Sequence, residues 1–216
     1  MPSVFRGDGK LLRKVLLFAC AALALAGCVT AKNTLSIEDV ATLKYSGTEV
    51  RFAPDAVIYW GDGERAYAAS KGQPATESDN LAKTPEGQAY LRNTIATKVK
   101  TAMERNLGKS LKGSRPVRAV VTVKKVMIAS AIQRIVLGGN HEMGGDVTLA
   151  DARTGAALLS YDGQTTPSAA GQGIAGALVD AALLPDPIDR VTDNYAITYT
   201  NWLTRYEPAD MMAAAR

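Results

Sequence analysis

The chain has 216 residues, two cysteines and one histidine, and its formal net charge at pH 7 is +4. Four of its 25 basic residues but only one of its 21 acidic residues lie within the first 27 positions, so the remainder is close to neutral. Near neutrality excludes a nucleic-acid footprint, and the few histidines and cysteines exclude a metal site built from these ligands, so we expect no nucleic acid, metal or cofactor.

The first 27 residues have the pattern of a secretory signal peptide. An apolar run of twelve residues, 15 to 26, follows a basic segment that contains Arg6, Lys10, Arg13 and Lys14. This run is too short for a spanning helix, which needs about 20 apolar residues. It ends in a lipobox, the site at which lipoprotein signal peptidase cleaves before an acylated cysteine, formed here by Leu25, Ala26, Gly27 and Cys28. We therefore predict that residues 1–27 are removed and that Cys28 is lipidated.

In this segment the chain resembles bacterial membrane lipoproteins. A cysteine with two or three acyl chains stays on a bilayer durably, whereas one chain gives only marginal binding. Val29, not aspartate, follows Cys28, which in enteric-type sorting favours the outer membrane. The resemblance implies attachment to the outer membrane, facing the periplasm. The segment 28–36 is short and polar and is predicted to form the tether between the lipid and the domain.

Residues 37–206 are predicted to form a single α+β domain, and 207–216 a flexible tail. Near the start of the domain, Leu35 to Leu43 fits either a strand or one helical turn. Extended segments are predicted at 48–52 and 56–60, interrupted at Pro54, and a turn is predicted at 61–63. Trp60 beside that turn is interpreted as a core residue, with a binding aromatic as the alternative. The polar stretch 70–84 is predicted to be a surface loop.

The helix predicted over Glu86–Leu107 has both a start signal and an apolar stripe. Thr84 is placed to cap it, Pro85 suits its first turn, and Gly108 is expected to end it. Apolar residues then recur at three- and four-residue steps, at Leu91, Ile95, Val99, Ala102, Met103 and Leu107. We expect this stripe to face the core.

Alternating patterns predict a strand at 116–128 and another at about 140–150. The second strand turns at Asp151–Gly155 into a hairpin arm at 156–161. His141 and Glu142 lack the second histidine of a zinc-protease helix. A histidine hydrogen-bonded in place is the favoured interpretation, and a titrating or partner-contacting His141 is the alternative.

Two helices are predicted after residue 165, where a loop should run to 170. Gly171–Gly176 matches the letters of a dinucleotide fingerprint, but no strand precedes it and no ribose-binding acid follows. We expect a buried core helix at about 172–184, with membrane contact or self-association as the alternative. The last helix begins at Pro187 and has an aromatic stripe, interpreted as core or as a partner surface, formed by Tyr195, Tyr199, Trp202 and Tyr206.

The mature part is similar to small alphaproteobacterial lipoproteins that have no assigned activity. The similar segments are 55–62, 115–118, 138–141 and 151–155. What this resemblance implies is a compact strand–helix–strand–strand domain on a lipid tether, covering about residues 40–161.

The predicted fold is α+β: an antiparallel or mixed sheet of about four strands, one long helix on a face and two C-terminal helices. No catalytic constellation is evident, so we expect a non-catalytic envelope lipoprotein that binds or supports a protein partner. The alternative is a small-molecule or lipid carrier, an auxiliary lipoprotein of a transport system. A carrier needs an apolar cavity, whereas a partner-binding protein should expose an apolar or aromatic patch.

Overall fold

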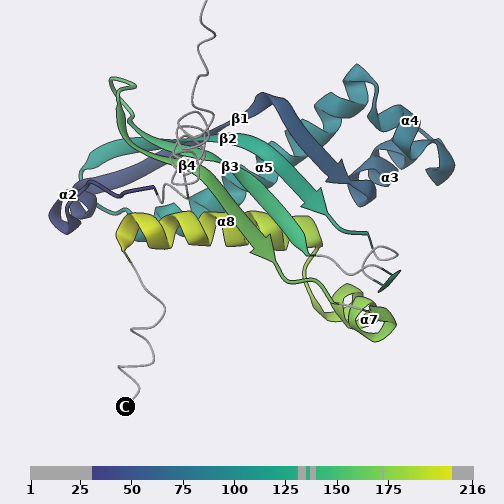
Figure 1. The fold of residues 1–216 in the computed structure, drawn as a ribbon. Coiled ribbons are helices and arrows are strands. Elements are labelled where there is room, and N and C mark those ends of the chain that lie inside the picture. Colours follow the sequence, from purple (N-terminus) through teal and green to yellow (C-terminus); the bar gives the residue numbers. More distant parts are fainter. Residues whose placement is uncertain (1–30, 131–134, 137–139, 172, 206–216) are drawn as a thin grey trace, which may run out of the picture. The chain divides into compact units, whose positions relative to one another are not determined.

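The structure, a computed structural model, describes residues 31–130, 135–136, 140–171 and 173–205. From residue 33 onward the described residues form one compact unit, and the description below concerns this unit. Its sheet has four strands in the order β1-β2-β3-β4: β1 (Leu43–Trp60), β2 (Arg115–Ile128), β3 (His141–Asp151) and β4 (Ala157–Ser168). β1 pairs parallel to β2, and the other neighbours are antiparallel. The predicted α+β class with a mixed sheet is confirmed (Figure 1).

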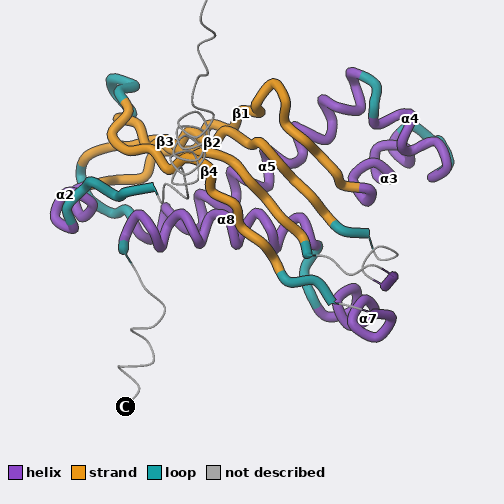
Figure 2. The backbone as a smooth tube through the Cα atoms, in the orientation of Figure 1, coloured by secondary structure: helices purple, strands orange, loops and turns teal. Residues whose placement is uncertain are grey.

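The helices are α2 (Ile37–Thr42), α3 (Gly61–Ser70), α4 (Ser78–Ala82), α5 (Pro85–Ser110), α7 (Gly173–Leu183) and α8 (Pro187–Thr204), with a 3-10 turn η1 (Ala75–Glu77). The long helix α5 packs on β1 and on α8, and α8 packs on β3 and β4. Figure 2 shows how these helices and the strands follow one another. The core therefore lies between one face of the sheet and the pair α5 and α8.

α5 forms where the sequence predicts it. The Thr84 side chain accepts a hydrogen bond from the Gly87 amide, and the six stripe residues are all buried. The predicted end at Gly108 is wrong, because the helix continues to Ser110. Leu107 and Leu111 are both buried, and the Leu111 amide donates to the Leu107 carbonyl at 2.8 Å. Burial of Leu111 carries the last turn past the glycine.

β1 is a single strand of 18 residues, not two. The predicted interruption at Pro54 is present as a register shift between Phe52 and Val57, because proline cannot donate to the ladder. Leu43 opens this strand, and α2 precedes it with a capping box between Ser36 and Asp39, which settles the alternative left open for this stretch in favour of a helix followed by a strand.

The predicted turn at 61–63 is wrong, because these residues begin α3. Trp60 is a core residue, as predicted, with 5% of its surface exposed. A Cβ on Gly63 would collide with the Trp60 ring, so the glycine lets the first turn of α3 pack under the indole. The predicted loop at 70–84 contains η1 and α4, and α4 buries Ala82 against the core.

β2, β3 and the turn after β3 agree with the sequence. Asp151 Oδ1 accepts hydrogen bonds from the Arg153 and Thr154 amides, and Gly155 has a φ of 75°. β4 is longer than predicted and reaches Ser168, which pairs with His141. The loop expected at 165–170 is therefore mostly strand. Its alternating burial, with Thr166 and Ser168 inward, comes from pairing with the full length of β3.

Gly145 in β3 is required by close packing. A Cβ at this position would collide with the Thr122 carbonyl oxygen and come within 3.3 Å of the Tyr195 hydroxyl. We expect Gly145→Ala to lower the free energy of unfolding by about 2 kcal/mol, because the neighbouring backbone must move. Urea unfolding measures this loss. The matched control is Gly144→Ala, whose Cβ would meet no atom closer than 3.5 Å, and equal losses for the two variants would contradict the packing argument.

Candidate functional site

The aromatic stripe of α8 is mostly core. Tyr195 and Tyr199 are completely buried, so the prediction that they contribute to a partner surface is corrected. They are buried because α8 packs its stripe against both α5 and the sheet. Burial raises the pKa of both phenol groups far above the usual range, with the Asp146 charge adding to the effect at Tyr195. Both hydroxyls stay neutral and do not act as acids or bases near neutral pH.

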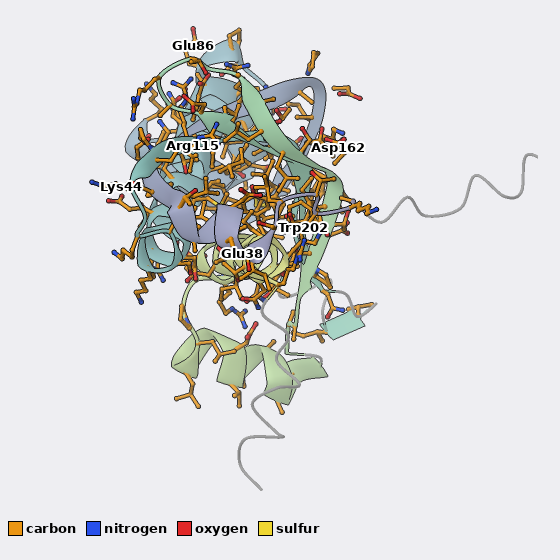
Figure 3. All side chains as sticks on the ribbon, turned by 90° about the vertical axis from the view of Figure 1, so that its left-hand side faces the viewer. Glu38, Lys44, Glu86, Arg115, Asp162 and Trp202 are labelled. Atoms are coloured by element: carbon orange, nitrogen blue, oxygen red, sulfur yellow. The ribbon has the colours of Figure 1, made fainter. Side chains whose placement is uncertain are left out.

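Trp202 is only partly buried and belongs to an aromatic cluster at the C-terminal end of α8. Its ring lies 4.4 Å from that of Tyr161 in an edge-on arrangement and 5.8 Å from that of Tyr199. Figure 3 looks onto this end of the molecule and places Trp202 on the same side as Asp162, a residue of β4. Such pairs stabilise packing by about 1 kcal/mol each. Tyr206 lies outside the described residues.

The chain enters the folded unit beside this aromatic cluster. Asn33 Nδ2 donates to the carbonyl oxygens of Trp202 at 3.1 Å and Leu203 at 2.9 Å. Arg205 donates to the Leu35 carbonyl at 2.6 Å. The two Asn33 bonds give carbonyls in the last turn of α8 a partner from outside the helix. They also fix where the segment leading back to Cys28 leaves the unit, whereas Leu25, Ala26, Gly27 and Cys28 themselves lie outside the described residues.

His141 occupies the first position of β3 and is fully buried. Its ring is therefore not available at the surface to a second protein. Within the described ranges there is no group of three or more histidine, cysteine or acidic side chains that could hold a metal ion. Among the described helices, none has both the length and the apolar character that crossing a membrane takes.

A pocket of about 390 Å³ lies between the start of β1 and α5. Its lining is mainly polar: Tyr45, Ser46, Gly47, Thr48, Lys100 and Glu104. The Tyr45 hydroxyl lies 2.9 Å from that of Thr48. Partial burial raises the pKa of Tyr45, the Thr48 hydrogen bond opposes this, and the Glu104 charge adds to it. A pocket with one cation, one anion and several hydroxyls does not suit an acyl chain.

The face of the sheet opposite α5 and α8 has mixed charged and apolar side chains, and we call it the open sheet face. The pairing register places Val57 and Tyr59 of β1 beside Lys125 and Met127 of β2, and Met127 beside Glu142 of β3. Val57 and Tyr59 are 53% and 61% exposed. Further along, the register places Arg51 beside Thr122 and Thr122 beside Asp146.

Three ion pairs lie on or beside the open sheet face: Glu49 with Arg51 at 2.7 Å, Lys124 with Asp146 at 2.6 Å, and Lys125 with Glu142 at 3.0 Å. Exposed pairs of this kind contribute about 0–1 kcal/mol to stability. Tyrosine, methionine and arginine are enriched in protein interfaces. The sequence did suggest a partner surface but placed it on α8. The signal for the open sheet face is the alternation of Val57 and Tyr59 with Ile58, which packs against the core, and Trp60, which belongs to it.

No protein-family model and no curated protein matches the chain. Solved structures that resemble it include the following two. One is a crystal structure from Caulobacter crescentus CB15 of a protein provisionally assigned as a lipoprotein, with 16% identity, a TM-score of 0.33, and coverage of 52% of this chain and 82% of that one. The other is a dodecamer of a methionine variant of PelC from Paraburkholderia phytofirmans, with 11% identity, a TM-score of 0.31, and coverage of 77% and 93%. At these scores neither resemblance bears on function.

Proposed function

We propose that this protein is a bacterial envelope lipoprotein, anchored by acylated Cys28 in the outer membrane facing the periplasm. Its domain is non-catalytic and supports a protein partner through the open sheet face. The anchor is supported by the basic segment, the short apolar run and the lipobox Leu25–Cys28. Acylation with two or three chains gives a durable attachment, so the protein works at a bilayer surface.

The tether is short, and its exit from the folded unit is fixed. Four residues lie between Cys28 and Asn33, so five Cα–Cα steps join them, and a fully extended chain of that length spans at most about 17 Å. Because Asn33 is bonded to the end of α8, that end of the unit is confined close to the lipid anchor. A partner is therefore met near the bilayer, where confinement raises its effective concentration.

The observation that supports partner binding is the exposed pair Val57 and Tyr59 within a charged surface. The Tyr59 side chain is 61% exposed, so a partner that covers it removes apolar surface from water, which favours binding. The charges of Lys125 and Glu142 beside this pair, and of Arg51 further along β1, supply the polar rim of a protein interface. The pocket beside Tyr45 has a mainly polar lining, which does not suit the acyl chain of a lipid.

Site-specific photo-cross-linking in intact cells tests this proposal. We expect a benzoylphenylalanine at Tyr59 to give one defined adduct, whereas the same group at Thr97, exposed on α5, gives none. Charge reversal by Arg51→Glu should lower the yield of the adduct at 59, since Arg51 is an exposed residue of the same face. Equal adduct patterns at 59 and 97, or a yield at 59 that Arg51→Glu leaves unchanged, would refute this surface.

A further inference from the structure

α7 is not the buried core helix that its composition suggests. Its apolar residues recur at four-residue spacing on the side that faces solvent: Ile174 is 67%, Leu178 66%, Val179 54% and Leu183 76% exposed. Leu184, just after the helix, is 47% exposed. No described element packs extensively on α7. Figure 1 shows α7 beyond the N-terminal end of α8, away from α2.

The side of α7 that faces the folded unit has small and polar residues, so the apolar residues lie on the side that faces solvent. Asp180 is 4% exposed and forms a two-pronged ion pair with Arg190 of α8, at 2.7 and 2.9 Å. A Cβ on Gly171 would collide with the Gly176 carbonyl oxygen, so the segment before the helix packs directly against its first turn. The usual polarity of a surface helix is thus inverted.

The outer side of α7 lacks what a protein interface normally offers. Its single charged residue, Asp180, is on the inner side, so none of the described side chains on the outer side carries a charge. Protein interfaces have about one hydrogen bond per 100–200 Å². A stable dimer takes roughly 20 residues from each partner, whereas α7 has eleven. The hydrocarbon region of a bilayer offers no hydrogen bonds and excludes charged groups. The outer side of α7, which is apolar and uncharged, suits that environment.

We propose that α7 inserts its outer side into the interfacial region of the lipid bilayer that holds Cys28. This inference rests on the proposed anchor. α7 is too short to span a bilayer and has no basic residue to attract anionic lipids. Its binding therefore depends on the confinement that the lipidated cysteine provides.

The two attachment points lie at opposite ends of α8. α7 precedes the N-terminal end of this helix, and Asn33 is bonded to the carbonyls at its C-terminal end. An 18-residue helix is about 27 Å long. With both ends held, α8 lies along the bilayer surface and the unit cannot rotate freely about its tether. The membrane thereby sets the direction in which the folded unit faces.

A fluorescent probe at position 178 tests this inference in the acylated protein. After removal of the signal peptide and acylation of Cys28, a cysteine introduced by Leu178→Cys is the sole free thiol. We attach a nitrobenzoxadiazole group and reconstitute the protein into phosphatidylethanolamine–phosphatidylglycerol vesicles, with and without phosphatidylcholine that has a nitroxide on its acyl chain. The matched control is Gln73→Cys, at an exposed site between α3 and η1.

We expect the emission at 178 to shift to shorter wavelength in vesicles and to lose most of its intensity with nitroxide lipid, while the probe at 73 is unaffected. Equal quenching at 178 and 73 would overturn the inference. A disulfide that joins two chains of the unlabelled Leu178→Cys variant, without lipid quenching of the labelled one, would also overturn it, in favour of a second copy. The intact mass of the same sample reports acylation of Cys28 independently, so failure of the anchor and failure of α7 insertion are distinguishable.

Discussion

Replacing Cys28 with serine is expected to leave a precursor that retains residues 1–27. The serine hydroxyl does not receive the diacylglyceryl group, and lipoprotein signal peptidase acts only after that transfer. Without acyl chains the domain loses the attachment that two or three chains provide. Metabolic labelling with a fatty acid should show loss of label, and gel mobility should show the longer precursor.

Cys20 provides the matched control for this variant. It lies within the apolar run, and Phe18, which is bulky, stands near it where the lipobox pattern requires small residues. Cys20→Ser is expected to leave labelling, processing and membrane fractionation unchanged, because this residue is discarded with the signal peptide. Retention of the label in Cys28→Ser, or its loss in Cys20→Ser, would contradict acylation at Cys28.

Replacing Arg190 with methionine is expected to release α7 from the folded unit. The substitution leaves the Asp180 carboxylate buried without its guanidinium partner, and breaking a buried pair in this way costs about 3–5 kcal/mol. Because α7 packs little against the rest of the unit, we expect local detachment and not global unfolding. Hydrogen–deuterium exchange should accelerate at residues 173–183 and remain slow in α5 and β2.

The paired variant Asp180→Leu with Arg190→Met is the control for a purely electrostatic cause. It replaces both charges with apolar side chains of similar size, which is often neutral or stabilising. Slow exchange in α7 should return. If Arg190→Met alone leaves exchange in α7 unchanged, the ion pair does not hold this helix. If the double variant exchanges as fast as Arg190→Met, the pair acts through something other than its charge.

The elements predicted correctly are those whose local and tertiary signals agree. α5 has a cap, a proline in its first turn and a continuous stripe, and all of these are satisfied by one packing arrangement. β2 alternates between buried and more exposed residues except at Lys124 and Lys125, where its register with β3 shifts. The first turn of α3 was missed because Gly61 and Gly63 favour a turn locally, and only the close approach of the Trp60 ring shows why a glycine stands at position 63 of a helix.

The candidate sites were harder to predict because sequence periodicity identifies an apolar face without showing what covers it. The α8 stripe and the α7 stripe both suggested burial or contact, and the structure assigns Tyr195 and Tyr199 to the core and Leu178 to the surface. On α7 the side that faces the folded unit carries Asp180, which is paired with Arg190, and the apolar residues lie on the opposite side. That pair joins residues ten positions apart on different helices, which no local pattern indicates.

The most direct test is the intact mass of the mature protein purified from membranes, followed by fragmentation of its N-terminal peptide. We predict that the peptide begins at Cys28 and that its sulfur bears a diacylglyceryl group. A chain that begins elsewhere, or a Cys28 with a free thiol in protein that buffer alone washes from the membrane, would contradict the account.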